Sequence, residues 1–217
     1  MLDIVKVTFT VTPESLEEGY RRGIFPMGHE GERAFTWHEP DPRGIIPLDA
    51  VHVPTSLRRR MRRGGYDITV DRAFGEVVRQ CAARPGVWLT PKLVAVYEEM
   101  HRRGRAHSLE VWVDGELAGG IFGVHVGGAF FAESKFHRVT DMSKVALVTL
   151  LGLLREAGFV LFDVQYWTPH LAQFGTVEVP KADYRARLEA ALRETREFPG
   201  AGRVQARPEL RWAKADS

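Results

Sequence analysis

Two polar residues interrupt the apolar run "LFDVQYW", which spans positions 161–167. Asp163 carries a carboxylate and Gln165 a carboxamide, while their neighbours are typical of a buried strand. In a strand, residues i and i+2 point to the same face, so the two polar side chains are expected to stand side by side. A carboxylate can take a proton from a nucleophile, and a carboxamide can hold an amine or stabilise an oxyanion. The spacing alone leaves open whether Asp163 and Gln165 do chemistry or have a structural role.

The alternative for Asp163 is a structural role, as a buried acceptor of hydrogen bonds. The two hypotheses predict different results for Asp163→Asn. Loss of a general base should leave melting near normal and lower the rate on the order of a hundredfold. Loss of a structural acid should chiefly lower stability.

A second informative stretch is "FAESKFHRVTDMSKVAL", at positions 131–147. Its pattern predicts a strand that delivers Glu133 and Ser134, then a short polar loop, then a helix that begins near Ser143 and Lys144. The first turn of a helix offers unpaired backbone N–H groups and a positive dipole end, which suit a phosphate. Glu133 is either an ordinary strand residue or part of a site at this helix end.

Charge is unevenly distributed along the chain. Its 217 residues include 30 Lys and Arg against 28 Asp and Glu, a net charge of only +2. No acid lies between Asp49 and Asp67, yet this interval holds the cluster Arg58, Arg59, Arg60, Arg62 and Arg63. A smaller cluster follows at Arg102, Arg103 and Arg105. The first cluster is either a surface that contacts phosphates or a solvated basic surface.

Several classes of protein are disfavoured. No run approaches the length of apolar sequence that spans a membrane, and the first residues lack the pattern of a signal peptide, so a cytoplasmic location is expected. The single cysteine, Cys81, excludes an internal disulfide and is expected in the core. The phosphate-binding, zinc-protease and serine-hydrolase motifs are absent, and the histidines lack ligand spacing, so we predict no cofactor and no metal. Structural roles are expected for His107 and His125.

Periodicity and turn residues predict the order of elements. Helices are expected at 12–23, 72–84, 91–104, 141–158 and 181–196. Strands are expected at 66–71, 107–113, 117–126, 129–136 and 159–165, with hairpin turns at 114–115 and 127–128. The helix at 141–158 is apolar almost all round and should be buried. The sequence thus predicts an α+β fold with a mixed, largely antiparallel sheet flanked by helices.

The N-terminal part is expected to be a small separate domain. The stretch 26–44 is rich in Gly and Pro and reads as a loop, which places a boundary near Asp41. We therefore predict a small domain at 1–41 and a catalytic domain at 42–217.

Six blocks together resemble one known family. They are "GYRRGIFPMG", "WHEPDPRGIIPLD", "VPTSLRRRMRR", "HSLEVWVDGELAGGIFGV", "FAESKFHRVTDMSKVAL" and "LFDVQYWTPHLAQFGTVEVP". In this order they look like the leucyl/phenylalanyl-tRNA–protein transferases, over most of the chain from Pro13 to Tyr184. The resemblance implies a main domain with the acyl-CoA-dependent N-acyltransferase fold and a small domain before it. It also implies transfer of Leu or Phe, sometimes Met, from aminoacyl-tRNA to proteins that begin with Arg or Lys, which marks them for degradation by the N-end rule.

The resemblance also implies roles for single residues. The catalytic Asp and Gln of the family's D-x-Q motif fall on Asp163 and Gln165, and a carboxylate beside the acyl-amino-acid pocket falls on Glu133, with Ser134 next to it. The apolar wall of that pocket falls on Met27, Trp88, Ile121, Phe130 and Leu150. The basic surface that faces tRNA falls on the cluster of Arg58 to Arg63, and we add Lys144 from the predicted helix start.

The chain departs from the family pattern at a few positions. Met27 stands where Trp is common, Lys135 where Met is common, and Val164 where Cys is frequent. The N-terminal domain is also shorter than is usual. The changes in the pocket bear on which amino acid is preferred rather than on the reaction.

Two other functions fit the sequence less well. An acetyl-CoA-dependent N-acetyltransferase would cradle a pyrophosphate with a glycine-containing loop before the central helix, but "HRVTDMSKV" contains no glycine. A non-enzymatic RNA-binding module would use the arginine cluster but would leave Asp163 unexplained, and no RNA-recognition signature is present.

Overall fold

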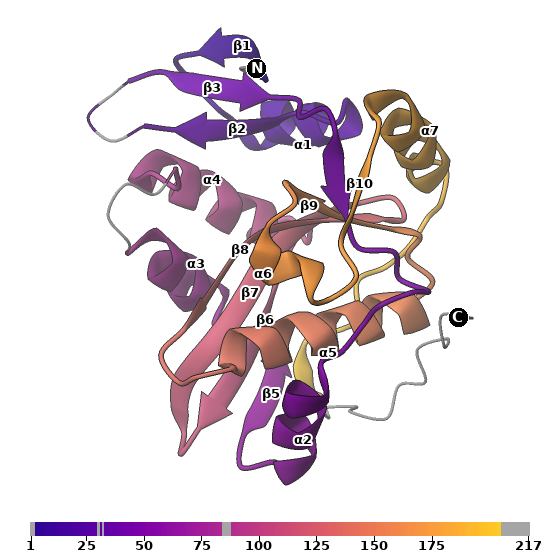
Figure 1. The fold of residues 1–217 in the computed structure, drawn as a ribbon. Coiled ribbons are helices and arrows are strands. Elements are labelled where there is room, and N and C mark those ends of the chain that lie inside the picture. Colours follow the sequence, from indigo (N-terminus) through magenta and orange to yellow (C-terminus); the bar gives the residue numbers. More distant parts are fainter. Residues whose placement is uncertain (1–2, 30, 32, 84–87, 205–217) are drawn as a thin grey trace.

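The computed structural model describes residues 3–29, 31, 33–83 and 88–204. These residues form a three-stranded sheet in the order β1-β3-β2 and an eight-stranded sheet in the order β10-β4-β9-β8-β7-β6-β5-β11. The small sheet lies at the top of Figure 1, above the edge of the large one. Helices pack on both faces of the large sheet, so the α+β fold predicted from the sequence is confirmed.

The large sheet is mixed, as predicted. Its only parallel pair among the described residues joins β8 and β9, and the other paired strands run antiparallel. Its strands are β4 (Arg43–Ile45), β5 (Asp67–Val70), β6 (Ala106–Val113), β7 (Glu116–Val126), β8 (Ala129–His137), β9 (Leu161–Gln165), β10 (Val177–Val179) and β11 (Gly202–Val204). Because β9 lies between β4 and β8, its residues are buried on both faces of the sheet.

The strands β6, β7 and β8 form the predicted meander. At the first turn Asp114 and Gly115 both have positive φ, of 51° and 81°, as the tight hairpin turn requires. At the second turn Gly127 has a φ of 60°. A Cβ atom added there would lie 2.7 Å from the carbonyl oxygen of Ala191, so glycine also permits a close backbone approach.

The helices divide between two cores. One core holds buried residues of α1 (Pro13–Arg21), α3 (Phe74–Ala82), α4 (Pro91–Arg102) and α7 (Lys181–Leu192). The other holds those of α2 (Thr55–Arg63) and α5 (Met142–Glu156), and the short α6 (Pro169–Ala172) contributes Leu171. Adjacent strand residues alternate between the two cores, for example Leu161 and Phe162 of β9.

The helix predictions hold in detail. Thr12 caps α1 with a capping box to Ser15, and Pro91 begins α4, as the sequence indicated. The helix α5 is buried along most of its length, and Cys81 is buried in α3.

The prediction of a loop over 26–44 is wrong. This stretch contains β3 (Phe35–His38) and most of β2 (Phe25–Gly28), which pair with each other and, through β3, with β1 (Ile4–Thr8). Cross-strand pairing and burial of Phe25, Phe35 and Trp37 outweigh the local preference of Gly and Pro for turns. The domain boundary near Asp41 stays a prediction.

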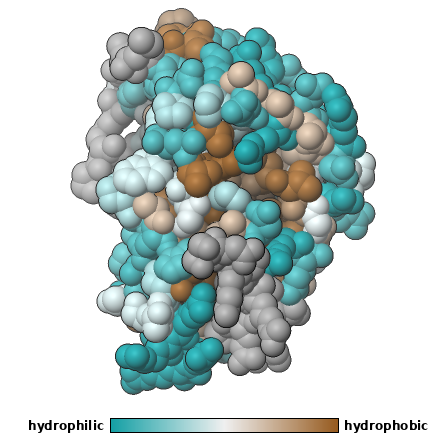
Figure 2. All heavy atoms as spheres, turned by 45° about the vertical axis from the view of Figure 1, so that its right-hand side comes forward, coloured by the Kyte–Doolittle hydropathy of each residue, from teal (hydrophilic) through white to brown (hydrophobic). Residues whose placement is uncertain are grey.

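No helix among the described residues is both long and apolar enough to cross a bilayer. Figure 2 shows a face that is mainly hydrophilic, with a group of hydrophobic residues near its middle.

A buried chain of polar side chains links β6 and β7. The His107 Nδ1 atom lies 2.7 Å from Asp71 Oδ2, and His107 Nε2 lies 3.0 Å from Nδ1 of His125. Phe198 stacks on the His107 ring with centroids 3.9 Å apart. Burial, together with the charges of His107 and Arg105, lowers the pKa of His125 to about 4. The contacts are those of a structural pair, which is the role predicted for both histidines.

This shift predicts a loss of stability in acid. The unfolded chain binds a proton at His125 near its ordinary pKa of 6.5, while the folded chain resists it down to about 4. The contribution of neutral His125 to the free energy of unfolding is therefore complete above its ordinary pKa of 6.5. It falls by about 2 kcal/mol from pH 7 to pH 5, because over this range the unfolded chain binds the proton and the folded chain does not. Urea unfolding at both pH values should show that His125→Phe loses this share of the pH dependence. The exposed control His52→Gln should retain it, and equal dependence in all three proteins would contradict the prediction.

Candidate active site

Asp163 is the centre of a buried polar network. It lies on β9 and its side chain has no exposure. Arg43 of β4 donates to both carboxylate oxygens, from Nε at 3.0 Å and from Nη2 at 2.8 Å. The hydroxyl of Tyr184 on α7 donates to Oδ2 at 2.5 Å, and the backbone N–H of Gln165 donates to Oδ1 at 2.8 Å. A carboxylate has about four acceptor positions, so the described residues occupy all of them.

Arg43 connects this network to the N-terminal part of the chain. Its Nη1 donates to the carbonyl oxygen of Gly23 at 3.0 Å, just beyond α1. The guanidinium also lies over the rings of Phe25 and Tyr184, 4.9 and 4.8 Å from their centroids. Burial has the largest single effect on the pKa of Arg43 and lowers it, but the charges of Asp163 and Tyr184 and the hydrogen bonds to Asp163 together raise this pKa above its ordinary value, so the guanidinium stays charged.

These contacts bear on the role of Asp163. Its carboxylate is buried and paired bidentately with a cation, as in the structural alternative drawn from the sequence. The general-base role stays a prediction. The geometry gives Asp163 a clear task of its own, which is to hold the end of β9 against β4 and α7.

Gln165 occupies a strained position at the end of β9. Its φ is 61°, an unusual value for a residue other than glycine. Its side chain is buried, yet within the described residues the carboxamide Nε2 has no hydrogen-bond partner. A buried N–H donor without a partner costs free energy, and such strain is typical of functional sites. The amide is thus ready to donate to a group that the chain itself does not supply.

Glu133 lies on the neighbouring strand β8, at an irregularity. The pairing with β7 shifts between Phe122 and Gly123, which face Ser134 and Ala132, so Glu133 is the extra residue of a β-bulge. Tyr20 of α1 donates to its Oε1 at 2.7 Å and Tyr97 of α4 donates to its Oε2 at 2.8 Å. Burial raises the pKa of Glu133 to about 7, the two tyrosine hydrogen bonds oppose this, and the charge of Asp163 supports it.

The predicted apolar wall is divided between the two cores. Met27 and Trp88 are partly buried and pack against the core that contains Tyr20 and Tyr97. The remaining members belong to the other core, beneath α5, and are fully buried: Ile121, Phe130 and Leu150. The structure therefore groups Met27 and Trp88 with the tyrosines that hold Glu133 and leaves the other three across the sheet. Ser134 lies beside Glu133 and is partly buried.

The predicted basic surface lies on α2. Within the described residues none of its five arginines forms an ion pair, and all but the partly buried Arg60 are exposed. Arg60 Nη2 lies 3.9 Å from Met142 Sδ, so α2 lies beside the start of α5. There Lys144 Nζ pairs with Asp141 Oδ1 at 2.9 Å. The second cluster differs, because Arg102 pairs with Glu99 and Arg103 with both Glu99 and Glu14.

Comparison with known proteins identifies the family. The family described as leucyl/phenylalanyl-tRNA protein transferase matches residues 45–189, and its N-terminal domain matches residues 10–41. Enzymes of that name from Salinibacter ruber, Ruegeria pomeroyi and Rubrobacter xylanophilus are 50%, 49% and 48% identical to this chain. The matches cover 84%, 87% and 87% of this chain and 80%, 90% and 98% of those proteins. The chain belongs to the leucyl/phenylalanyl-tRNA–protein transferase family.

Family membership confirms that the chain is an enzyme, an aminoacyltransferase, as the six sequence blocks predicted. Solved structures match less closely. A GCN5-related N-acetyltransferase-like protein from Streptococcus suis aligns over 88% of this chain and 65% of its own, at 10% identity and a TM-score of 0.31.

Sequence reasoning missed the residues that hold the two carboxylates of this transferase. Arg43, Tyr184, Tyr20 and Tyr97 were not predicted, although Arg43 and Tyr20 lie within the six blocks. An arginine directly before the apolar run "GII" was the available signal for Arg43, since a buried arginine needs an acidic partner. The three tyrosines fit the apolar faces of their helices, and nothing in the sequence separates them from ordinary core residues.

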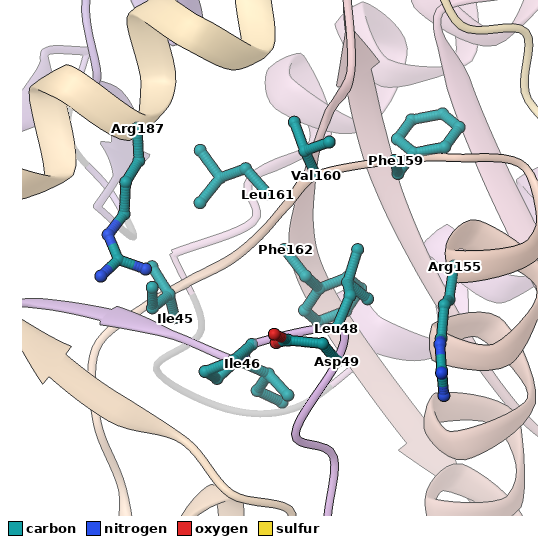
Figure 3. A pocket seen from close by; sticks show the side chains of 11 residues that line it. Ile45, Ile46, Leu48, Asp49, Arg155, Phe159, Val160, Leu161, Phe162 and Arg187 are labelled. Carbon is teal, nitrogen blue, oxygen red and sulfur yellow. The ribbon is translucent and has the colours of Figure 1, made fainter. Parts of the chain in front are cut away.

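A cavity of about 370 Å³ lies elsewhere, at the beginning of β9 (Figure 3). Its lining is mainly apolar, with charged residues Asp49, Arg155 and Arg187. None of the residues predicted for the site lines it, so it is not the predicted acyl pocket.

The buried pair predicts a large effect on stability. Asp163→Asn leaves the Arg43 charge buried without its partner, which should cost about 3–5 kcal/mol of unfolding free energy. For Asp163→Asn, a large loss of stability is therefore expected in place of the near-normal melting predicted for the loss of a general base. In urea unfolding, the double change Arg43→Met with Asp163→Leu should recover much of the loss, because it removes both buried charges. The control Glu17→Gln breaks the exposed pair with Arg21 and should cost less than about 1 kcal/mol. An unchanged midpoint in Asp163→Asn would contradict this prediction.

Proposed function

We propose that this transferase moves Leu or Phe from aminoacyl-tRNA to the α-amine of proteins that begin with Arg or Lys. The product is a protein with a new N-terminal Leu or Phe, marked for degradation by the N-end rule. Because aminoacyl-tRNA and its protein acceptors meet in the cytoplasm, we place the enzyme there. The observation that carries the proposal is the buried Nε2 of Gln165 at the end of β9, which finds no hydrogen-bond partner in the described part of the chain.

The chemistry suits an activated donor. An aminoacyl ester already stores the free energy for making a peptide bond, so the transfer itself needs no ATP, metal or covalent intermediate. The Nε2 of Gln165 supplies a hydrogen bond to the ester carbonyl as negative charge develops on its oxygen. Asp163 fixes the backbone N–H of Gln165 and so acts as a positioning residue for the catalytic amide. Holding the amine and the ester close together lowers the activation free energy by several kcal/mol more.

The site also suits a basic acceptor. Glu133 gives this face of the sheet a carboxylate that no arginine or lysine pairs with directly among the described residues. A negative group favours an acceptor whose first side chain is positive. The aromatic and apolar side chains of Trp88 and Met27, on the same side as the Glu133 tyrosines, suit the Leu or Phe of the donor.

The arginines of α2 would hold the tRNA. All but the partly buried Arg60 are exposed, and among the described residues none forms an ion pair, so their charge is available to phosphates. Arg60 contacts Met142 at the start of α5, and we include Lys144 of the same helix in this surface. Arg102 and Arg103 are neutralised by Glu99 and Glu14 and are not part of it.

The donor can be tested directly. Purified protein, Leu-tRNA and a peptide that begins with Arg should give a product with N-terminal Leu. Because the ester is already activated, omitting ATP or adding a chelator should change nothing once the tRNA is charged. Mass spectrometry of the peptide checks the result, with a peptide that begins with Gly as control. Acylation seen only with acetyl-CoA would contradict the proposal.

The tRNA surface predicts a salt effect. Changing Arg59, Arg60 and Arg62 to Ala should weaken tRNA binding and flatten its dependence on salt, by roughly one unit of log-log slope for each phosphate that no longer meets an arginine. The matched control changes Arg102 and Arg103 to Ala, which removes arginines already paired with acids. Binding is measured over a salt series. Equal slopes for the wild type and the α2 variant would mean that these arginines form a solvated surface that does not contact tRNA.

A further inference from the structure

We propose that Glu133 is the group that takes the proton from the acceptor's α-ammonium, while Asp163 only positions Gln165. This inference rests on the proposed function and assigns the proton transfer within it. It comes from the different surroundings of two carboxylates on neighbouring strands.

The strand geometry puts Glu133 opposite the reacting end of β9. The parallel pairing of β8 and β9 sets Phe131 beside Asp163 and ends there. Two residues further along each strand lie Glu133 and Gln165. The bulge re-aims Glu133, and the positive φ of Gln165 turns β9 away, so the two strands separate where their polar side chains begin. A reacting amine between the strands meets the Gln165 amide on one side and the Glu133 carboxylate on the other.

The two carboxylates differ in how many of their acceptor positions remain open to a substrate N–H group. All four acceptor positions of Asp163 are filled, two of them by the cation Arg43. The described residues give Glu133 two donors, the hydroxyls of Tyr20 and Tyr97, which leaves room for two more. Glu133 also keeps some exposure, while Asp163 has none. Only Glu133 can receive a further N–H.

The charged and titratable groups around Glu133 set the pKa of its carboxyl group. They are Tyr20 of α1, Tyr97 of α4, Asp163 of β9 and Arg43 of β4. Burial raises the pKa of Glu133 to about 7, against the effect of the two hydroxyls. A peptide α-amine has an ordinary pKa of about 8. The pKa values of the α-amine and of Glu133 are therefore close to each other. This is the condition under which a general base works best near neutral pH.

The transfer forms one C–N bond, breaks one C–O bond and moves two protons. One proton passes from the α-ammonium to the Glu133 carboxylate and leaves a neutral amine. The amine nitrogen attacks the ester carbonyl carbon, so a C–N bond forms and the C–O bond to the tRNA ribose breaks. A second amine proton goes to the ribose oxygen, which leaves as a hydroxyl. Glu133 then returns its proton to water.

The test uses two acceptors. One is an Arg-led peptide, and the other is the same peptide with an aminooxy group in place of the α-amine, which is neutral throughout the assay range. In single-turnover assays with Leu-tRNA, Glu133→Gln should slow transfer to the amine on the order of a hundredfold. Transfer to the aminooxy peptide should change by less than about threefold, since its nucleophile needs no deprotonation.

Other outcomes overturn the inference. An equal loss with both acceptors, or a raised KM for Leu-tRNA with kcat unchanged, would mean that Glu133 binds the donor. Full activity with the amine would mean that it has no role. A wild-type protein inactive with Leu-tRNA would instead refute the proposed function, so the two failures are distinguishable.

A second variant protects against misfolding of the first. Tyr97→Phe removes one hydrogen bond to the Glu133 carboxylate, so the acid limb of the kcat profile near pH 7 should move to higher pH. A purely structural tyrosine would lower activity without moving the limb. Tyr66→Phe, which loses a hydrogen bond to the Met61 carbonyl, serves as the control and should leave the limb in place. An unmoved limb in Tyr97→Phe would overturn the inference.

Discussion

The ion pair between Arg43 and Asp163 governs the architecture of the site. Two charges removed from water are costly unless every hydrogen bond is made, and here the described residues satisfy all positions on the carboxylate. Meeting that demand forces β4, β9 and α7 into one arrangement. The remaining guanidinium N–H extends the constraint to the carbonyl of Gly23 at the end of α1.

This constraint explains why an unfavourable backbone survives at Gln165. A left-handed conformation and a buried amide Nε2 that no described residue pairs with each raise the free energy of the folded chain. The Asp163 carboxylate holds the Gln165 N–H directly, so the turn at the end of β9 cannot relax without breaking the buried network. The same link brings the N-terminal part to the site, since α1 supplies Tyr20 and is followed directly by the Gly23 carbonyl.

Sequence patterns predicted the elements better than the contacts between them. Helix caps, hairpin turns and the apolar helix α5 depend on neighbouring residues, and these predictions hold. The strands β2 and β3 were missed because their stability comes from pairing with each other and with β1. The spacing of Asp163 and Gln165 marked the right place, but the partner of Asp163 lies 120 positions away on β4. Such a contact is set by the topology of the sheet, which no local pattern encodes.

The two carboxylates show how one face of a sheet supports two tasks. Asp163 lies against Arg43, and its lone pairs are occupied. Glu133 lies among neutral hydroxyls and apolar side chains, so burial raises its pKa to about 7, and its charge responds to small changes near neutrality. Neighbouring carboxylates with different hydrogen-bond partners can thus divide positioning from proton transfer. The charge of Asp163 itself helps to raise the pKa of Glu133, so the residue that fixes the site also tunes the one that titrates.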